Sequence, residues 1–170
     1  GITTLLVCLL MLGGMDWFDS ICHAFATTGT GGFSTKQASV AYYNSPYIEY
    51  VISIFMFISG INFTLVLLFV NRKFKKFISN AELKFYFSSV VFFTAVIAIA
   101  LYYTSPMGME ESFRKSLFQV ISLHTSTGFA TDDYMQWSPV LWGLLTIIML
   151  MGACAGSTTG GLKCIRMVIL

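Results

Sequence analysis

The chain has 170 residues, of which 56% are hydrophobic and 11% are charged. Soluble domains usually carry about 25% charged residues, so the composition excludes an ordinary soluble domain and predicts an all-α integral membrane protein whose apolar side chains face lipid. The net charge of +2 argues against a nucleic-acid partner.

Cysteine usage and the start of the chain limit the possibilities further. The four cysteines form no C-x-x-C pair and no cluster with histidine, so neither a disulfide framework nor a metal site is predicted. The first residue lies inside an apolar run with no basic leader and no cleavage motif. We therefore expect no signal peptide and interpret the chain as an excerpt of a longer protein.

The first half of the chain alternates long and short apolar runs. Residues 1–12 are apolar and are predicted to be the end of a spanning helix. Residues 16–28 form a shorter run that ends in a Thr/Gly-rich stretch at 27–35, called the first loop below. Residues 47–70 form a full-length apolar run, and a basic loop at 71–84 follows it.

The second half repeats this order. Residues 85–104 form a full-length apolar run, and residues 112–124 form a short one that ends in the second loop, residues 125–131. Residues 139–151 are apolar and break into the Gly-rich segment, residues 152–163. Apolar residues resume after it, which predicts a last helix that is interrupted.

Length separates the runs into two kinds. A helix needs about 20 residues to cross a hydrocarbon core of about 30 Å, and the runs at 47–70 and 85–104 meet this requirement. The runs at 16–28 and 112–124 would form helices only about 18–20 Å long. Since their neighbours are predicted to span, the short runs are predicted to be re-entrant pore helices.

The charge distribution orients these elements. The loop at 71–84 has one acid, Glu82, among five basic residues: Arg72, Lys73, Lys75, Lys76 and Lys84. Short loops rich in Lys and Arg face the cytoplasm. The loop is therefore predicted to be cytoplasmic, and both re-entrant helices are predicted to enter and leave on the outer face.

An internal repeat connects the two halves. When the chain is shifted by 96 residues, so that position 19 falls on position 115, the segment 19–35 matches 115–131. The identical pairs are Ser20/Ser116, Gly32/Gly128, Phe33/Phe129 and Thr35/Thr131. The match lies in the polar part, where biased composition contributes little. It predicts two tandem helix–pore loop–helix units, at 1–78 and 79–170, related by a pseudosymmetry axis.

The two loops have the composition of ion-binding backbone. Irregular backbone at membrane depth is tolerated where it is buried or lines a water-filled path. Gly32 and Gly128 are predicted to adopt positive φ, which turns consecutive carbonyls toward one axis, as in the carbonyl rings of K⁺ channel filters. The C-terminal end of each short helix also favours a cation. Phe33 and Phe129 are predicted to pack behind the loops. The alternative is an ordinary Gly/Thr helix C-cap.

Three motifs resemble those of a known family: AFATTGTGGFST at 24–35, TSTGFAT at 125–131 and GACAGSTTGGLK at 152–163. Together they are similar to the Trk/Ktr/HKT superfamily, and most of all to the membrane subunit of Trk-type bacterial potassium uptake systems. The resemblance covers essentially the whole chain. It implies that 1–78 and 79–170 are units two and three of four, arranged with the pseudo-fourfold symmetry of a K⁺ channel.

The resemblance also implies roles for individual residues. Two sets would supply K⁺-binding quarters of the selectivity filter: Thr30, Gly31 and Gly32 in unit two, and Ser126, Thr127 and Gly128 in unit three. The Gly-rich segment would be an intramembrane gate beneath the filter. Its implied gating residues are Gly152, Gly156, Ser157, Thr158, Thr159, Gly160, Gly161 and Lys163.

The residues of the Gly-rich segment support a helix break on their own. Its glycines make it a poor helix interior, and a flexible polar plug in a pore is suited to gating. The glycines at 152, 156 and 160 also have the spacing of a close-packed helix face, so that alternative stays open. Lys163 is expected either to function at membrane depth or to anchor the chain at the cytoplasmic interface.

The resemblance implies uptake of K⁺, the transported ion, across the bacterial inner membrane, with no cofactor in this chain. Whether transport is channel-like or follows a symporter mechanism coupled to H⁺ or Na⁺ is left open. The implied partners are the lipid bilayer, a second copy of the full-length chain in a homodimer, and a cytoplasmic nucleotide-binding regulatory subunit. The sequence contains no nucleophile–base pair, so no enzyme is predicted.

Two alternative functions stay open. The first is an ion-coupled secondary transporter of another small solute, which predicts an inverted repeat. The second is a non-transporting membrane scaffold, which has no need of Thr/Gly loops after short helices.

Overall fold

The structure, a computed structural model, describes residues 1–70, 72, 77–160 and 164. The described part is helical and contains no sheet. Seven α-helices are described: α1 (Ile2–Leu12), α2 (Trp17–Thr28), α3 (Pro46–Ser59), α4 (Phe63–Val70), α6 (Ala81–Thr104), α7 (Met109–His124) and α8 (Pro139–Leu150). Two short 3₁₀ helices, η1 (Ser39–Tyr43) and η2 (Tyr134–Gln136), lie in the connections that follow the two loops.

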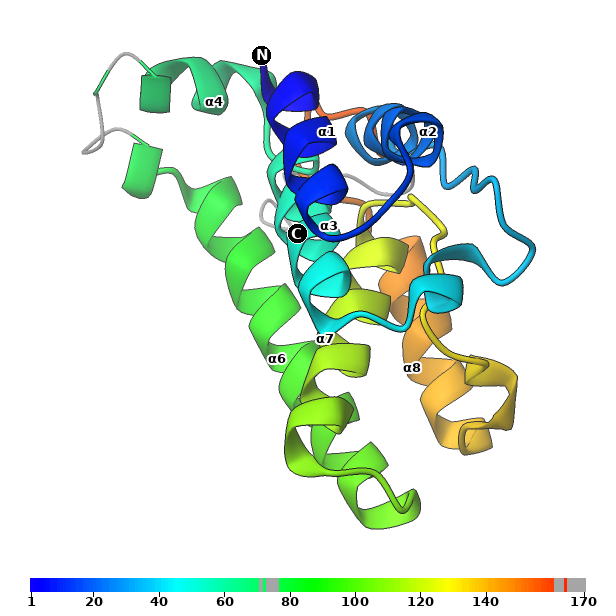
Figure 1. Cartoon of the computed structure of the whole chain (residues 1–170). Coiled ribbons are helices and arrows are strands. Elements are labelled where there is room, and N and C mark those ends of the chain that lie inside the picture. The colour runs from blue at the N-terminus through cyan, green and yellow to red at the C-terminus, as the bar shows by residue number, and fades with distance from the viewer. Residues whose placement is uncertain (71, 73–76, 161–163, 165–170) are drawn as a thin grey trace.

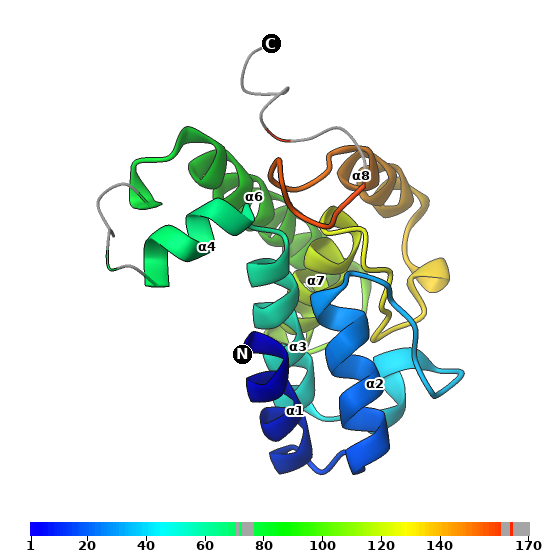
Figure 2. The ribbon, with the colours of Figure 1, turned by 90° about the horizontal axis from the view of Figure 1, so that it is seen from above.

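The helices pack in the order that the repeat predicts. In the first unit α1 packs against α2, and in the second α6 packs against α7. Helix α3 joins the two units because it contacts α1, α2 and α7. Figure 2 shows α3 and α7 near the centre, with α1 and α2 on one side and α6 and α8 on the other. The C-terminal ends of α2 and α7 approach each other there (Figures 1 and 2).

Helix starts follow the local chemistry of the sequence. Helices α3 and α8 each begin with a proline, Pro46 and Pro139, after a serine. Proline suits the first helical turn because its fixed φ matches the helix and its missing N–H has no intrahelical partner there. Helix α6 begins after Asn80, whose side chain accepts a hydrogen bond from the Leu83 N–H at 3.1 Å. The two Ser-Pro pairs therefore start α3 and α8 shortly after the connections that contain η1 and η2.

The run at 47–70, predicted to be long enough to span the membrane, is not one continuous helix. The structure divides this run into α3 and α4, which are bent by 106° at the break. The carbonyl of Gly60 accepts a hydrogen bond from the Cys154 N–H at 3.2 Å instead of continuing the helix. The side chain of Asn62 accepts one from the Thr64 N–H at 2.9 Å and so starts α4. The break therefore provides the backbone to which the Gly-rich segment binds.

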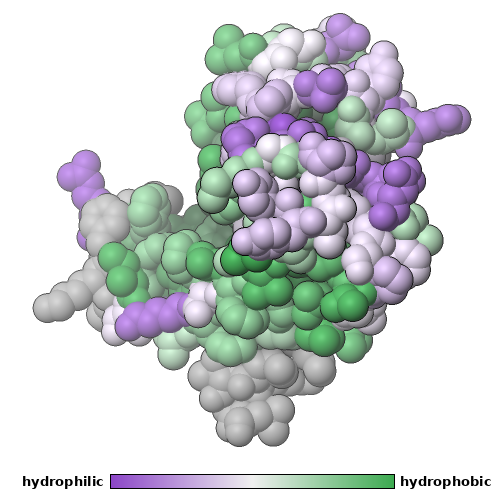
Figure 3. Space-filling view, turned by 90° about the horizontal axis from the view of Figure 1, so that it is seen from below, coloured by the Kyte–Doolittle hydropathy of each residue, from purple (hydrophilic) through white to green (hydrophobic). Residues whose placement is uncertain are grey.

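Helix α6 is the element most suited to a membrane. Among the described residues it is the one continuous helix long and apolar enough to cross a bilayer, and α3 with α4 passes the same test only as a bent pair. Large apolar side chains project from it to the outside, including Phe92 and Ile99. Seen from the end that carries the α6–α7 turn, hydrophobic residues cover one part of the surface and hydrophilic residues gather on another (Figure 3).

The buried core runs through both units. Leu6, Ile52 and Met56 fill the contact between α1 and α3, and Ile97 and Phe118 fill that between α6 and α7. Each of these five side chains is fully buried. The core holds α2 and α7, which carry the two loops, in fixed positions.

Candidate functional site: two adjoining loops

The two loops have the same backbone conformation at equivalent positions. In the first loop φ is positive at Thr30 (51°) and Gly32 (66°), and in the second it is positive at Ser126 (55°) and Gly128 (83°). The prediction of positive φ for the two glycines is confirmed. The sequence did not indicate it for Thr30 and Ser126, because left-handed backbone is uncommon for residues other than glycine.

The N–H groups of both loops point back into their own helices. The Gly31 N–H donates to the Ala26 carbonyl at 2.8 Å, and the equivalent Thr127 N–H donates to the Ser122 carbonyl at 2.8 Å. The Ser126 N–H donates to the Leu123 carbonyl at 3.0 Å. These bonds satisfy the last carbonyls of α2 and α7, as helix C-caps do. The C-cap alternative is thus correct for the N–H side of each loop.

The carbonyl sides are left open. No described residue donates a hydrogen bond to the carbonyl oxygens of residues 30–32 or 126–128. Thr30 and Thr127 are buried, Gly32 is half-buried, and Gly31, Ser126 and Gly128 are exposed, so these carbonyls are open to a partner other than the described residues. A dehydrated cation is a partner that carbonyl oxygens can bind. The open carbonyls distinguish these loops from helix caps that only end a helix.

The two loops also touch. A Cβ atom built on Gly32 would lie 1.9 Å from the carbonyl oxygen of Thr127, so a residue with a side chain cannot occupy this position without a backbone shift. Farther along, the Ala41 N–H donates to the Ala130 carbonyl at 3.2 Å, and the Ala130 N–H donates to Ser39 Oγ at 3.3 Å. The structure therefore brings both predicted residue sets together.

The two phenylalanines that follow the loops differ. Phe129 is fully buried and stacks on His23, with 5.8 Å between ring centroids. Its carbonyl accepts a hydrogen bond from Ser122 Oγ at 2.7 Å. The packing role is confirmed for Phe129 and wrong for Phe33 in this chain, because Phe33 is 81% exposed. The described residues provide Phe33 with no counterpart of the His23 surface.

The Gly-rich segment lies against both loops. Thr30 Oγ1 donates to Thr158 Oγ1 at 2.9 Å. A Cβ atom on Gly160 would lie 3.6 Å from Ser126 Oγ. Residues 152–160 contain no helical turn, in agreement with the predicted break after α8.

Other predicted gating residues hold the segment in its non-helical shape. Ser157 Oγ donates to the Cys154 carbonyl at 2.6 Å and lies 2.7 Å from Thr159 Oγ1. Gly156 has a φ of 73°, and a Cβ atom there would lie 3.3 Å from the side chain of Asn62. The carbonyl of Gly152 accepts a hydrogen bond from Cys164 Sγ. Gly161 and Lys163 lie outside the described residues.

Sequence reasoning missed the side chains that anchor this segment. The carboxylate of Glu82, in the first turn of α6, accepts a hydrogen bond from the Ala155 N–H. The Nδ1 atom of His124 donates to the Met151 carbonyl at 2.6 Å, and its Nε2 atom lies 2.8 Å from Ser89 Oγ. A signal for Glu82 was present in the sequence, because it is the single acid of the basic loop.

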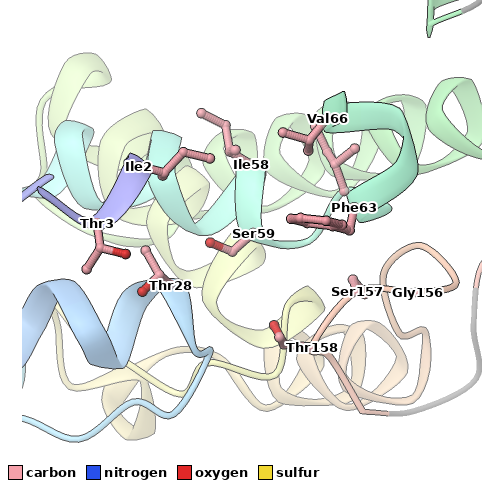
Figure 4. Close-up of a pocket in the computed structure, with 11 residues that line it drawn as sticks. Ile2, Thr3, Thr28, Ile58, Ser59, Phe63, Val66, Gly156, Ser157 and Thr158 are labelled. Atoms are coloured by element: carbon pink, nitrogen blue, oxygen red, sulfur yellow. The ribbon is translucent and has the colours of Figure 1, made fainter. Parts of the chain in front are cut away.

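A cavity of about 240 Å³ opens beside the Gly-rich segment. Its lining includes the hydroxyl-bearing residues Thr28, Ser59, Ser157 and Thr158. Thr28, Ser59 and Thr158 direct their side chains toward the space between α2, α3 and the segment (Figure 4). Ile58, Phe63, Val66 and other apolar side chains form the larger part of the lining. The cavity is therefore mainly apolar, with hydroxyl groups beside the point where Thr158 meets the first loop.

The site carries no metal-ligand cluster in the described part of the chain. No group of three His, Cys, Asp or Glu residues is placed there to hold a metal ion. The ligands that the loops offer are backbone carbonyls and hydroxyls, which suit a weakly held, dehydrated monovalent cation.

Comparison with known proteins gives a consistent result. The family model named TrkH and described as "Cation transport protein" matches residues 9–170. The Trk system potassium uptake protein TrkH of Escherichia coli K12 is 40% identical over 166 residues, which cover 95% of this chain and 34% of that protein. TrkH of Halomonas elongata is 34% identical over 161 residues, which cover 94% of this chain and 33% of that protein.

A solved structure agrees with the fold. The crystal structure of the potassium transporter TrkH from Vibrio parahaemolyticus matches with a TM-score of 0.93 and 34% identity. The match covers 99% of this chain and 37% of that one. The chain thus spans about a third of the length of the relatives that it matches.

Proposed function

Since the chain belongs to the TrkH family of cation transport proteins, we propose that it is the middle part of a potassium uptake protein of a bacterial inner membrane. The relatives named as Trk system potassium uptake proteins support this substrate. Residues 1–78 and 79–170 would be units two and three of a four-unit pore.

The observation that carries the proposal is the meeting of two loops with open carbonyls. Residues 30–32 and 126–128 form two adjoining quarters of a selectivity filter. Their carbonyl oxygens replace the water shell of K⁺. The C-terminal ends of α2 and α7 add partial negative charge at the same place. The N–H groups of residues 30, 31 and 126–128 donate to carbonyls of those helices, so these residues present oxygen to the ion.

The Gly-rich segment acts as the gate. It lies against both loops through Thr158 and Gly160, and it is fixed by hydrogen bonds to Glu82 and Gly60. For the gate to open, the segment must break its contacts with the two loops. Its glycines permit a second backbone arrangement. The gate includes Gly161 and Lys163, as the resemblance implies.

In the proposed orientation both loops enter the membrane from its outer face, and the 71–84 loop lies in the cytoplasm. The apolar outer surface of α6 supports contact with lipid. The full-length protein is proposed to form a homodimer and to bind a cytoplasmic nucleotide-binding regulatory subunit. The word "system" in the names of the relatives is consistent with more than one component.

Rubidium uptake tests the proposal. Vesicles that contain the full-length protein would be placed in a solution of radioactive rubidium and competing Na⁺, and the Rb⁺ that enters them would be measured. Wild type should take up Rb⁺ selectively, Gly128→Ser should lose the selectivity, and deletion of residues 156–161 should leave the pathway open. A lack of cation flux in wild type would refute the pore and favour a membrane scaffold. Flux unaffected by Gly128→Ser would refute the filter.

A further inference from the structure

Each loop is spanned by an ion pair, and the two pairs have opposite polarity. In unit two, Lys36 Nζ lies 3.2 Å from Asp19 Oδ2. In unit three, Lys115 Nζ lies 3.3 Å from Asp132 Oδ2. The shift of 96 residues that superposes the repeats places position 19 on 115 and position 36 on 132. Equivalent positions therefore carry the same contact with the acid and the base exchanged.

In unit two the acid is on the pore helix. Asp19 lies in the first turn of α2 and is only 5% exposed. Its carboxylate accepts hydrogen bonds from Tyr43 Oη and Thr35 Oγ1, each at 2.7 Å. These bonds and the neighbouring Lys36 ammonium lower the pKa of Asp19 to about 2, although burial opposes the shift. Asp19 is thus ionised at neutral pH. One group from the end of the first loop, Thr35, and two from the chain after it, Lys36 and Tyr43, converge on it.

In unit three the base is on the pore helix. Lys115 pairs with Asp132 and, one helical turn away, with Glu111 at 3.0 Å. Asp132 comes directly after the second loop and accepts a further hydrogen bond from Trp137 Nε1 at 3.4 Å. Thr131, the counterpart of Thr35, is buried, and its hydroxyl has no hydrogen-bond partner in the described structure. The exchange of the carboxylate for a lysine at position 115 explains this difference, since no carboxylate faces Thr131 from the helix.

The position of the pairs relates them to the ion-binding backbone. Each pair joins the pore helix before a loop to the first residue after it, and so closes the chain segment that contains the open carbonyls. Both pairs are partly buried: the side chains of Asp19 and Lys115 are 8% and 15% exposed. Partly buried pairs are screened by salt less than surface pairs. A chance surface contact would not be expected to recur at both equivalent positions with reversed charges.

We infer that Asp19–Lys36 and Lys115–Asp132 are equivalent brackets, positioning ion pairs that fix the geometry of the two filter loops and thereby the discrimination between K⁺ and Na⁺. This inference rests on the proposed function. The polarity of a bracket is exchangeable, because unit three is a natural example of the swapped arrangement on the same backbone frame.

The test uses charge reversal and charge swap in the full-length protein. Asp19→Lys and Lys36→Asp alone each place like charges together, and the double variant restores a pair with the polarity of unit three. Breaking a partly buried pair leaves an uncompensated charge, so each single variant should lower the ratio of Rb⁺ to Na⁺ uptake by about tenfold. The double variant should recover the ratio to within about threefold of wild type, the residual loss arising from a cation at the N-terminus of α2.

Unit three supplies the matched control. Asp132→Lys breaks the bracket, whereas Asp133→Lys makes the same change in net charge at the neighbouring exposed position, which has no ion pair in the described structure. Asp132→Lys should lower the uptake ratio and Asp133→Lys should leave it within about twofold of wild type. Equal effects of the two variants would show that only the net charge near the second loop matters, not the ion pair, and would overturn the inference.

A second measurement does not depend on transport. Hydrogen exchange of the amides of residues 30–32 in the purified protein should be about tenfold faster in Asp19→Lys and return toward wild type in the double variant, as local opening becomes easier and then harder. If wild type shows no Rb⁺ uptake, the proposed function fails. The hydrogen-exchange rates alone then show whether the ion pair fixes the loop. Unchanged exchange in the single variant, or no recovery in a folded double variant, would overturn the inference.

Discussion

Units two and three share one loop backbone but complete it differently. In unit three, Phe129 is buried on His23, a residue of unit two. In unit two, the equivalent Phe33 is exposed. The second loop is therefore packed by a residue of the first unit, while its own helix supplies the C-cap. The second unit is thus not self-contained, because its loop packs on the first.

Substitution of the two equivalent glycines, Gly32 and Gly128, should show the largest difference between the units. Gly32→Ala places a methyl group 1.9 Å from the Thr127 carbonyl and also forces alanine to a φ of 66°. Gly128→Ala meets no atom within 4 Å, so its cost is the left-handed backbone alone, about 1–2 kcal/mol. Gly32→Ala should abolish Rb⁺ uptake and lower thermal stability more than Gly128→Ala does. Equal losses would contradict the close contact between the loops.

The phenylalanines give the next largest expected effect. Phe129→Ala removes a fully buried ring and should reduce the free energy of unfolding by about 3–5 kcal/mol. Phe33→Ala in the full-length protein should cost a similar amount if the preceding unit covers that ring as unit two covers Phe129. Denaturation of both variants in detergent measures this. A Phe33→Ala variant as stable as wild type would show that the two units share the loop backbone but not the packing of the phenylalanine that follows it.

The anchor of the gate should have a moderate effect. Glu82→Gln keeps an oxygen that can accept from the Ala155 N–H but removes the charge that strengthens the bond. Hydrogen bonds to charged groups contribute about 1.5–3 kcal/mol, so the variant should hold the gate less firmly and raise basal Rb⁺ uptake several-fold. Lys84→Gln, an exposed change on the same helix, is the control. Uptake equal in both variants would exclude Glu82 as an anchor.

The smallest expected effect is that of pH. The lowered pKa of Asp19 means that its stabilising contribution is present above its unfolded value and is lost as pH falls through about 2. Burial lowers the pKa of Lys115, but Glu111 and Asp132 together raise it above 10.5. Its contribution is therefore lost only as pH rises beyond that value.

Asp19 and Lys115 should thus stay charged between about pH 5 and pH 8. The difference in thermal stability between wild type and Asp19→Asn should be constant over this range. A difference that grows or shrinks between these limits would contradict the charge state assigned to Asp19.

The sequence predicts the features that polar residues mark. The short helices, the positive φ of Gly32 and Gly128, and the end of α8 before residue 152 all follow from Thr, Ser and Gly interrupting apolar runs. The bend between α3 and α4 does not, because hydropathy over 47–70 reports burial in lipid and not helix continuity. That bend depends on the contact of Gly60 with Cys154, which is distant in the chain.

The site shows the same limit. The residues of each loop could be identified from the repeat, since the identical positions lie in it. The exposure of Phe33 and the bond from Ala155 to Glu82 could not, because both depend on which element lies opposite. The brackets lie between these cases: the charges at 19, 36, 115 and 132 are visible in the repeat frame, but only the structure shows that they pair.

The location of a bound ion tests the central claim most directly. Crystals of the full-length protein grown with Rb⁺ would be measured at the rubidium absorption edge. The account predicts an anomalous peak surrounded by the carbonyl oxygens of residues 30–32 and 126–128, and its loss in Gly32→Ala. Rubidium sites elsewhere with none between the two loops would contradict the assignment of these loops as a filter.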